Sequence, residues 1–419
     1  MDEFDVIVIG AGAAGVSAVR RLSAEGRSVC VLERRRRLGG RAWTWRDPSG
    51  FPLDLGCGWL HSADENELSI LATEMGYAID KTPPPWLSQL SAIEAPSEEL
   101  AERGKAIGEF FGRLDEAGAS ETDQAADRLL ELGCRWNPLI NAISTYINGV
   151  ELDRLSVKDF WRYRDTGVNW RVAEGYGTLI AALGTGPNIV FDCAVTLIDF
   201  TSAVVRIETP RGDLRARAAI VTVPTNVLCS GSLRFQPDLP DKMEAASVLP
   251  LGLADKLFLG FDDAEEVPKD SRLMGAGNSG GTGAYHVRPF GRPLIEAYFG
   301  GRLARDLEEE GEAAFAAFAI DQLAELMGNS IRKRLRPIAA SAWGRDPAAC
   351  GSYSHALPGH ADARSVLAAP VAGKLFFAGE ACSAHDFSTA HGAWRTGIAA
   401  AEAAIAATAK AQGSKHACG

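Results

Sequence analysis

The sequence has few of the features that mark extracellular, metal-binding or membrane proteins. Its eight cysteines stand singly, with no Cys-x-x-Cys pair and no cysteine–histidine spacing suited to a metal ion. No apolar run approaches the length needed to cross a bilayer, and the acidic start Met1-Asp2-Glu3 is unlike a signal peptide. We therefore expect free thiols, no metal site, no membrane segment and a cytoplasmic location.

An excess of positive charge is also absent. The formal net charge of −11 argues against a nucleic-acid partner and would not repel a cationic substrate. The length of 419 residues is enough for two domains, and a hydrophobic fraction of 46% is ordinary for a folded protein. No internal repeat is present, and nothing in the sequence indicates the oligomeric state.

The first thirty-three residues carry the strongest signal in the chain. Four apolar residues, Val6 to Ile9, run into a Gly-x-Gly-x-x-Gly loop (Gly10, Gly12, Gly15), and a helical pattern follows. This order places the N–H groups of a helix start beside a tight turn, where they favour a pyrophosphate. A second strand ends at Glu33, about twenty residues further on, where an acid suits ribose hydroxyls. The stretch predicts an adenine dinucleotide.

A run of four arginines follows, Arg34 to Arg37, and then Gly39-Gly40-Arg41. Between a ribose-binding acid and a glycine pair, a guanidinium can reach phosphate oxygens. We expect Arg41 and Arg34 to face the cofactor, and residues 35–37 to be solvated.

Strand and helix patterns predict an α/β protein, with a Rossmann-like cofactor-binding domain (GxGxxG) assembled from discontinuous segments and an inserted α+β domain for the substrate. We assign residues 1–80, 175–236 and 342–419 to the cofactor-binding domain. Residues 81–174 and 237–341 form the substrate-binding domain, which begins near the prolines at 83–85 because they cannot continue a helix.

Several elements inside these segments can be predicted from their patterns. They are a mainly helical segment (96–165), a small β-meander (189–220), a strand (256–261), a long helix (308–327) and a last helix starting near His391. Within the meander, residues 209–213 are a hairpin signal. A glycine-rich loop lies near 275–283.

Further motifs occur in a fixed order along the chain. They are Asp54-Leu55-Gly56-Cys57-Gly58-Trp59-Leu60-His61, Asp255-Lys256-Leu257, Trp343-Gly344-Arg345-Asp346-Pro347, Gly351-Ser352-Tyr353-Ser354, Phe377-Ala378-Gly379-Glu380 and Ser388-Thr389-Ala390-His391-Gly392-Ala393. Together with the Gly10–Gly15 loop they resemble the flavin-containing amine oxidase superfamily of monoamine oxidases, polyamine oxidases and lysine demethylases. The resemblance covers nearly the whole chain and is closest to the polyamine oxidase branch.

The resemblance implies FAD-dependent oxidation of a C–N bond. A hydride passes from the amine to flavin N5, the imine hydrolyses to an aldehyde or ketone, and O2 becomes H2O2. Such a transfer needs a shaped, water-excluding pocket and no strongly placed general base. A polyamine or another primary or secondary amine is the implied small-molecule substrate.

Four side chains are implied to serve the reaction. Lys256 matches the lysine that holds a water against flavin N5, although the alternating Leu257 and Leu259 would equally suit a lysine on the solvent face of a strand. Tyr353 matches one wall of an aromatic cage, and Thr389 stands where monoamine oxidases have the second tyrosine. Thr389 would open the pocket and could donate a hydrogen bond. His61 matches a Trp-x-His beside the flavin.

The implied FAD site draws residues from the whole chain. They are Gly10, Gly12, Ala14, Gly15, Glu33, Arg34, Gly40, Arg41, Gly56, Cys57, Gly58, Trp59, Val195, Trp343, Gly379, Glu380, Thr389 and Ala390. Trp343 is expected to pack against the flavin ring, and Glu380 suits ribityl or ribose hydroxyls. Ser352 stands where monoamine oxidases carry a cysteine bonded to FAD, and Cys350 is two residues away, so we expect noncovalent FAD.

Three other functions remain open at this point. An L-amino-acid oxidase would need an arginine for the substrate carboxylate, and Arg162, Arg164 and Arg171 cannot be placed from sequence. A desaturase of the phytoene or protoporphyrinogen type shares the FAD motifs. A flavin-binding protein without enzymatic activity is the third alternative.

Overall fold

Eight strands form the larger of two main sheets in the computed structural model, which describes residues 3–87, 97–186, 188–275 and 281–416. The strand order is β11-β8-β9-β10-β1-β2-β7, and β17 also pairs with β10. The bounds are β1 Glu3–Ile9, β2 Val29–Leu32, β7 Asn188–Val190, β8 Leu197–Asp199, β9 Val205–Thr209, β10 Gly212–Val221, β11 Arg234–Gln236 and β17 Leu375–Phe377. The pairs of β1 with β2 and with β10 are parallel, which confirms the predicted α/β fold.

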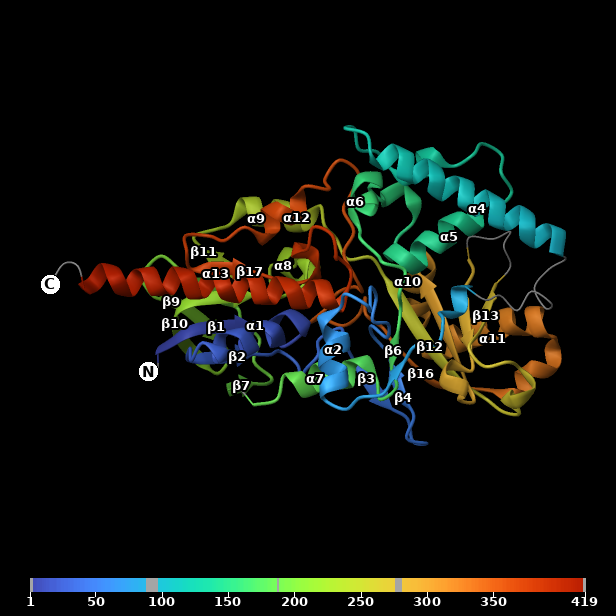
Figure 1. Cartoon of the computed structure of the whole chain (residues 1–419), viewed down its shortest axis with the longest axis horizontal. Helices are drawn as coiled ribbons and strands as arrows, with labels where there is room; N and C mark the ends of the chain where they lie inside the picture. Colours follow the sequence, from blue (N-terminus) through green and yellow to red (C-terminus); the bar gives the residue numbers. More distant parts are fainter. Residues whose placement is uncertain (1–2, 88–96, 187, 276–280, 417–419) are drawn as a thin grey trace.

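Helices cover both faces of this sheet, because the central strands are apolar on both sides. Val6 and Val8 of β1 face α1 (Ala13–Ala24) and α13 (Ala390–His416), which lie side by side along the sheet (Figure 1). Ile7 and Ile9 point the other way, into a core shared with α8 (Thr225–Cys229), α9 (Pro240–Ser247) and α12 (Ala363–Ala368). The hairpin predicted at 209–213 joins β9 to β10.

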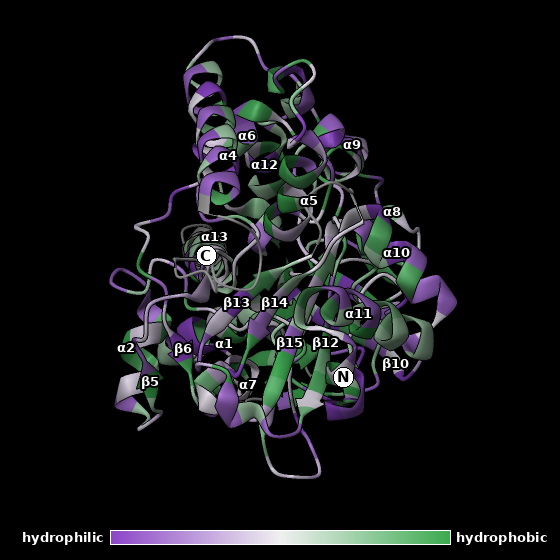
Figure 2. Ribbon diagram, turned by 90° about the vertical axis from the view of Figure 1, so that its right-hand side faces the viewer, coloured by the Kyte–Doolittle hydropathy of each residue, from purple (hydrophilic) through white to green (hydrophobic). Residues whose placement is uncertain are grey.

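The second sheet has five antiparallel strands in the order β13-β14-β15-β12-β16. The bounds are β12 Ala254–Phe261, β13 Ser271–Met274, β14 Ala284–Val287, β15 Leu294–Gly300 and β16 Leu335–Ala340. One face packs on α10 (Gly301–Glu310) and α11 (Glu312–Met327), and β12 and β15 are mostly hydrophobic in Figure 2. The single helix predicted for 308–327 was wrong, because Gly311 has a φ of 96° and ends α10.

Three helices, α4 (Ser97–Gly118), α5 (Asn137–Asn148) and α6 (Val157–Arg162), enclose a separate apolar cluster that includes Phe110, Leu139 and Ile143. They fall in the segment predicted to be helical. The shorter elements are α2 Glu67–Glu74, α7 Tyr176–Leu183, β3 Thr44–Arg46, β4 Pro52–Asp54, β5 Ile79–Asp80, β6 Arg171–Val172, and the 3₁₀ helices Pro85–Leu87, Ala126–Leu129, Leu152–Arg154, Ala264–Glu266, Pro289–Gly291, Asn329–Arg334 and Glu380–Cys382.

The strands of the two main sheets separate along the sequence. All eight strands of the larger sheet lie within 1–80, 175–236 and 342–419, and all five of the smaller sheet lie within 237–341. We therefore propose these ranges, with 81–174 added to the second set, as a cofactor-binding and a substrate-binding domain. In the predicted glycine-rich loop, residues 276–280 lie outside the described residues. Among the described helices, none combines the length and hydropathy needed to cross a membrane.

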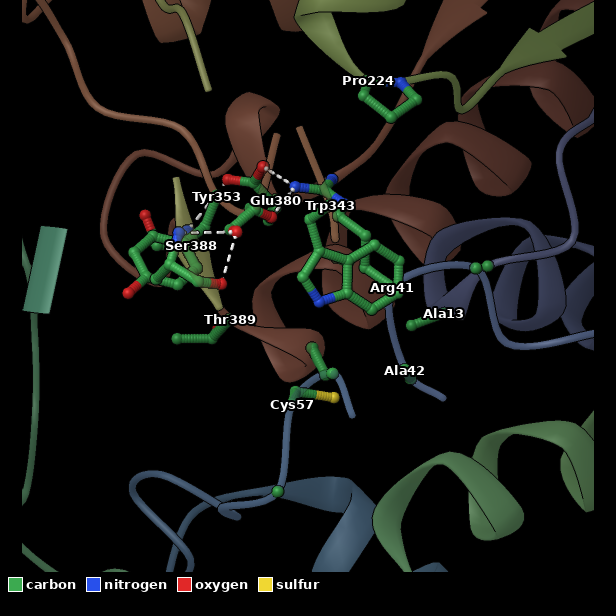
Figure 3. A pocket seen from close by; sticks show the side chains of 18 of the residues that line it. Ala13, Arg41, Ala42, Cys57, Pro224, Trp343, Tyr353, Glu380, Ser388 and Thr389 are labelled. Atoms are coloured by element: carbon green, nitrogen blue, oxygen red, sulfur yellow. Dashed lines mark hydrogen bonds and ion pairs between the residues drawn. The ribbon is translucent and has the colours of Figure 1, made fainter. Parts of the chain in front are cut away.

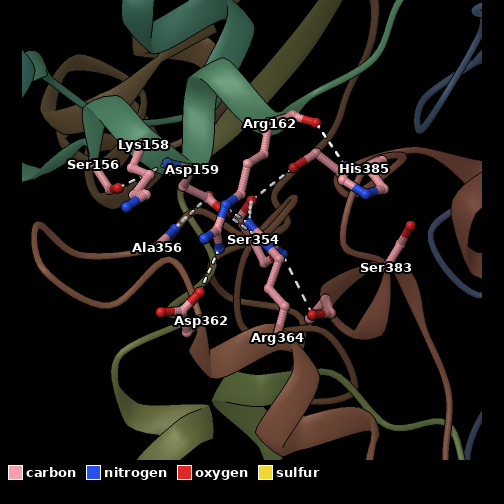
Figure 4. Close-up of polar contacts among 12 residues, drawn as sticks. Ser156, Lys158, Asp159, Arg162, Ser354, Ala356, Asp362, Arg364, Ser383 and His385 are labelled. Carbon is pink, nitrogen blue, oxygen red and sulfur yellow. Dashed lines mark hydrogen bonds and ion pairs between the residues drawn. The ribbon is translucent and has the colours of Figure 1, made fainter. Parts of the chain in front are cut away.

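The two proposed domains meet at a cavity, part of whose wall is drawn in Figure 3. Behind that wall, Arg364 of α12 and Asp159 of α6 form an ion pair whose side chains are 2% and 1% exposed. Arg364 Nε and Nη2 donate to the two carboxylate oxygens at 2.7 and 2.8 Å (Figure 4). Asp159 also accepts from the Ala356 N–H, and Arg364 Nη1 donates to Ser354 Oγ at 2.9 Å. The pair thus ties the helical segment to the loop that carries Ser354.

We expect Asp159→Asn to lower the free energy of unfolding by about 3 kcal/mol, because it leaves the Arg364 guanidinium buried without its charge partner. Urea denaturation of the full chain, followed by tryptophan fluorescence, measures this change. Asp127→Asn, at an exposed carboxylate, is the matched control and should change stability by less than about 0.5 kcal/mol. Equal losses in the two variants would contradict the assigned role.

Candidate active site

A cavity of about 1190 Å³ extends from the glycine loop after β1 to one face of the five-stranded sheet. Its wall includes residues from both main sheets, from α1 and α13, and from the helical segment. Every residue proposed above for the FAD site or the reaction lines this cavity, with the exception of Gly15. The cavity therefore brings together positions that are separated by up to 380 residues in sequence.

The N-terminus of α1 opens onto the cavity through Gly10, Gly12, Ala13 and Ala14. Gly12 is the cap and has no side chain to satisfy the first N–H groups, and the first turn contains no acid. The helix dipole and these donors make an anion site. Gly15 has a packing role instead: an added Cβ would lie 1.9 Å from the Gly10 carbonyl oxygen, so glycine allows α1 to lie close to β1.

Glu33 ends β2 at the cavity wall and is buried. One carboxylate oxygen accepts from the Ala11 N–H and the other from the Arg35 N–H, both at 2.7 Å. These bonds fix the orientation of the carboxylate. Because each oxygen has two lone pairs, both can still accept a hydroxyl group.

The first two residues of the arginine run line the cavity and also bond to distant segments of the chain. Arg34 lines the cavity, and its Nη1 donates to the Pro347 carbonyl at 3.1 Å. Arg35 also lines the cavity and forms an ion pair with Asp346 at 2.7 Å. The prediction that Arg35 is solvated was therefore wrong, because an acid distant in sequence holds it against the wall.

Of the next two arginines, Arg36 is exposed, as predicted, and pairs with Asp192. The guanidinium of Arg37 lies 4.6 Å from the centre of the Trp43 ring and is half-buried. Burial lowers the pKa of Arg37 to about 10. The prediction that Arg37 is solvated was thus wrong, since the Trp43 ring takes the place of water on one side of the guanidinium.

Arg41 and Glu380 join the two ends of the chain at the cavity. Arg41 Nη1 donates to Glu380 Oε1 at 2.8 Å and to the Ser352 carbonyl at 2.7 Å. Glu380, which lies beside Arg41 in Figure 3, also accepts from Ser354 Oγ and from the Ser388 N–H. Burial alone would raise the pKa of Glu380, but Arg41 and the hydrogen bonds hold it below its usual value. Glu380 is thus an ionised carboxylate that holds together the segments carrying Arg41, Ser354 and Ser388.

The loop after β4 forms another part of the wall. An added Cβ at Gly56 would lie 1.7 Å from the Arg41 carbonyl oxygen, so this close approach needs glycine. Burial raises the pKa of the Cys57 thiol to about 12, so it stays protonated. Trp59 packs edge-on against Trp86, with ring centres 4.6 Å apart. Gly58 lies next to Cys57, and all four loop residues line the cavity.

Trp343 and Val195 line the same cavity from other segments. Trp343 is buried, and its Nε1–H donates to the Leu55 carbonyl at 3.0 Å. Its ring meets the Trp43 ring edge-on, with centres 6.3 Å apart. These contacts fix the ring plane, which is what a residue that packs against a flat cofactor requires.

The face of the five-stranded sheet away from α11 points into the cavity. Residues directly opposite one another in antiparallel strands share a face. One such row is Met274, Ala284, Tyr298 and Lys256, and the neighbouring row is Arg272, His286, Glu296 and Phe258. Seven of these eight residues line the cavity. The polar face of β12 that carries Lys256 is therefore the cavity wall and not an outer, solvent-exposed face of the sheet.

Lys256 is buried at this wall. Its Nζ donates to the Asp54 carbonyl at 2.9 Å and forms an ion pair with Glu296 Oε1 at 2.8 Å. Burial alone would lower the pKa of Lys256, but Glu296, Tyr298 and the Asp54 carboxylate raise it overall. Lys256 is therefore an ammonium group at neutral pH. An added Cβ at Gly58 would lie 3.2 Å from Nζ, so the glycine loop leaves room for it.

Two tyrosine hydroxyls meet beside Lys256. Tyr353 donates to the Tyr146 carbonyl at 2.7 Å, and the Tyr298 and Tyr353 hydroxyl oxygens are 3.2 Å apart. Burial raises the pKa of Tyr353 well above its usual value, so the phenol is neutral. Tyr298 and Glu296 were missed by the sequence reasoning. Their alternation with Ile295, Ala297 and Phe299 was the signal that could have found them.

Thr389 and Ala390 line the cavity at the start of α13. The Thr389 hydroxyl donates to the Asp386 carbonyl at 2.6 Å and accepts from the Gly392 N–H at 3.0 Å. This is the geometry of a helix N-cap. The expectation that this hydroxyl is free to donate to a ligand was wrong, because the helix start uses its proton. Gly379, with a φ of 142°, lies nearby in the wall.

His61 also lines the cavity, and its Nδ1 is 2.6 Å from Asn169 Oδ1. Burial lowers the pKa of His61, and the nearby His391 lowers it further, whereas Asp165 opposes the shift. The imidazole is therefore neutral at pH 7. Because Asn169 Oδ1 is an acceptor, it favours a proton on Nδ1 and leaves Nε2 as the acceptor.

Ser352 and Cys350 differ in access to the cavity. Ser352 lines it, and its hydroxyl bonds to both the N–H and the carbonyl of Ala254 at 2.8 Å. Cys350 is not among the described residues that line the cavity; its φ is 58° and its N–H donates to the Asp346 carbonyl. The cysteines that do line it are Cys57 and Cys193, among the described residues.

Comparison with known proteins gives a consistent result. Rice (Oryza sativa subsp. japonica) polyamine oxidase 5 is 30% identical over 95% of this chain and 87% of its own length. Arabidopsis thaliana polyamine oxidase 2 is 31% identical over the same shares of the two chains. Lysine-specific histone demethylase 1 homolog 3 of the same rice subspecies is 29% identical, and the match spans 98% of this chain but 55% of the demethylase.

A solved structure of wild-type putrescine oxidase bound to putrescine superposes with a TM-score of 0.77. It covers 97% of this chain and 99% of that protein, at 18% identity, and therefore shows the shared fold. The family model for flavin containing amine oxidoreductases matches residues 13–405. These matches confirm the resemblance predicted from the motifs: the chain belongs to the family of flavin-containing amine oxidoreductases, in which its similarity is to polyamine oxidases.

Proposed function

We propose that the chain is a cytoplasmic oxidase that binds FAD noncovalently and oxidises a polyamine or another primary or secondary amine. The imine product hydrolyses to an aldehyde or ketone, and O2 is reduced to H2O2. The observation that carries this proposal is the cavity itself, which joins an uncapped helix N-terminus to a wall of aromatic and charged side chains.

The residues at the α1 end of the cavity fit FAD. The first N–H groups of α1 can bind the pyrophosphate, and Glu33 has free lone pairs for ribose hydroxyls. Gly40 lies against Gly12, where an added Cβ would come within 3.1 Å of Gly12 Cα. Glycines at both positions therefore let the two backbone segments pack closely beside the start of α1. The start of α13 at Ala390 adds a second helix dipole beside the cavity.

Bound FAD would supply a two-electron acceptor for the C–H bond next to the amine nitrogen. The chain itself orients the amine and limits access of water. Tyr353 and Tyr298 present neutral phenols, and Trp59 adds an apolar wall. A weakly hydrated pocket favours the neutral amine, which has the lone pair that oxidation requires.

The charge distribution supports a cationic amine as the substrate that enters. Asp165 is an exposed carboxylate that lines the cavity. Carboxylates of this kind attract an alkylammonium group at longer range. The relatives named polyamine oxidases, and the superposed putrescine oxidase, point to the same class of compound.

The L-amino-acid oxidase alternative gains no support from the three arginines considered for it. Arg171 forms buried ion pairs with Asp80 and Asp270, and Arg162 pairs with Asp362. Neither these two nor Arg164 is among the described residues that line the cavity. We therefore place an L-amino-acid oxidase that would use one of these three arginines behind amine oxidation. The relatives named polyamine oxidases place a desaturase and a non-enzymatic flavoprotein behind it as well.

We expect anaerobic mixing with polyamines or other amines to bleach the flavin absorbance near 450 nm, a general property of flavin reduction by substrate. Monoamines, polyamines and L-amino acids, tested in parallel by stopped-flow spectroscopy, would identify the substrate class. Bleaching by amino acids alone would overturn the proposed substrate. Bleaching by none would favour a non-enzymatic flavoprotein.

Lys256→Met should slow the reaction of the reduced flavin with oxygen by roughly tenfold, equivalent to about 1.4 kcal/mol, because it removes a buried cation from the cavity wall. FAD should remain bound, since its pyrophosphate and ribose would be held by the start of α1 and by Glu33, which belong to other segments. Stopped-flow reoxidation in aerated buffer measures the effect, and the exposed Lys333→Met is the matched control. Unchanged oxygen kinetics in Lys256→Met would refute the assigned role.

Acid precipitation of the holoenzyme should release all of the flavin into the supernatant. Cys350 lies outside the described cavity lining, and burial keeps the Cys57 thiol protonated and a poor nucleophile. Absorbance of the supernatant and mass spectrometry of the pellet check this directly. Yellow colour that stays with the precipitated protein would show a covalent bond.

A further inference from the structure

Lys256 is held by a carboxylate from the neighbouring strand. In the pairing of β12 with β15, Lys256 lies opposite Tyr298, and Glu296 is the diagonal neighbour two residues away. A long side chain reaches a diagonal partner on the same face of a sheet. Glu296 Oε1 and Lys256 Nζ are 2.8 Å apart, and their side chains are 19% and 9% exposed.

The other oxygen of Glu296 faces His286, from which polar and charged side chains continue to Arg171 and Asp80. Glu296 Oε2 is 3.9 Å from His286 Nδ1, and His286 Nε2 is 3.0 Å from Asp270 Oδ1. Arg171 Nη2 donates to Asp270 Oδ1 at 2.7 Å and to Asp80 Oδ2 at 2.6 Å. One oxygen of Glu296 therefore faces the Lys256 ammonium group, and the other faces a histidine that shares Asp270 with Arg171.

This arrangement keeps Glu296 ionised although it is largely buried. Burial alone would raise the pKa of Glu296, but Lys256, His286 and Arg171 hold it below its usual value. The anion in turn opposes the effect of burial on Lys256, whose pKa is raised overall. Each charge of the pair is therefore maintained by the other.

We propose that Glu296 is a positioning residue that holds the Lys256 ammonium against the Asp54 carbonyl and directs it into the cavity. An ammonium group has three N–H donors. In the described contacts, Glu296 takes one and the Asp54 carbonyl takes another. The third is left for a water or substrate atom in the cavity. This assignment rests on the proposed role of Lys256 in the oxygen reaction.

The groups that face this pair come from five elements. They are the Asp54 carboxylate of β4, Cys57 of the loop after β4, Arg171 of β6, His286 of β14 and Tyr298 of β15. Glu296 is the carboxylate in direct contact with the ammonium group, whereas Asp54 contributes a hydrogen bond through its carbonyl. Loss of the Glu296 charge therefore removes the main influence that opposes the lowering of the Lys256 pKa by burial.

The sign of the expected pH effect follows from these contacts. Lys256 in the folded protein has a raised pKa, so the ammonium form persists through neutral and moderately alkaline pH. In Glu296→Gln, burial is no longer opposed by the paired carboxylate, and the apparent pKa of Lys256 should fall by about one unit or more. A step that needs the ammonium would then be lost at lower pH than in the wild type.

The direct test is the rate at which acetic anhydride labels Lys256 as a function of pH, measured by mass spectrometry on the full chain with and without FAD. In the wild type, the apparent pKa should lie above the ordinary value of about 10.4. Glu296→Gln should shift it downwards, Glu296→Asp should restore most of the shift because it keeps the charge, and the exposed Glu309→Gln should match the wild type.

The second readout is the pH profile of flavin reoxidation in the same variants. We expect its alkaline limb to move to lower pH in Glu296→Gln, with flavin reduction by the amine changed less than reoxidation. A purely structural role would instead lower both rates at every pH, without a shift of the profile.

Two results would overturn the proposal. One is a wild-type apparent pKa of Lys256 below the ordinary value, which needs no variant to be measured. The other is a folded Glu296→Gln protein with an unchanged labelling profile. Failure of every amine to reduce the flavin would refute the proposed function alone, since the labelling result does not depend on turnover.

Discussion

A charge removed from water needs a partner, and this constraint determines the layout of the cavity wall. Lys256 is paired with Glu296, Arg41 with Glu380 and Arg35 with Asp346. In each pair the two residues belong to different segments of the chain. The ion pairs therefore fix the relative positions of strands, loops and helix starts that are distant from one another in sequence. The Arg364–Asp159 pair applies the same principle one layer behind the wall.

The two sheets contribute different things to the cavity because their strands are buried differently. The larger sheet is apolar on both faces, so only the ends of its strands can present functional groups, and Glu33 and the loop at Gly10 lie there. The smaller sheet packs one face on α11 and turns the other towards the cavity. Its functional side chains, such as Lys256 and Tyr298, therefore stand along the strands. These two modes of burial account for the two ends of the cavity that we propose for the dinucleotide and for the substrate.

The sequence was sufficient where local pattern decides the structure. The apolar run at Val6–Ile9 and the glycines after it predicted a buried parallel strand, a tight turn and a helix start, and the comparisons confirmed the family. The sequence was insufficient where the burial or hydrogen bonding of a side chain depends on a partner that is distant in sequence. Arg37 is half-buried because Trp43 lies under it, and the Thr389 hydroxyl caps α13. Glu296 is significant only beside Lys256, and that contact depends on strand register.

The pairing of Lys256 also bears on how a cationic substrate can approach a cationic side chain. An isolated ammonium in a weakly hydrated cavity would repel an alkylammonium strongly. With Glu296 at 2.8 Å, the pair presents little net charge at a distance, so the repulsion is largely cancelled. Lys256 can still donate a hydrogen bond at short range. At the same time, the surrounding rings disfavour a charged nitrogen close to them, which promotes loss of the substrate's proton. In the proposed function, the Glu296–Lys256 pair thus lets one pocket admit a cationic amine and oxidise a neutral one.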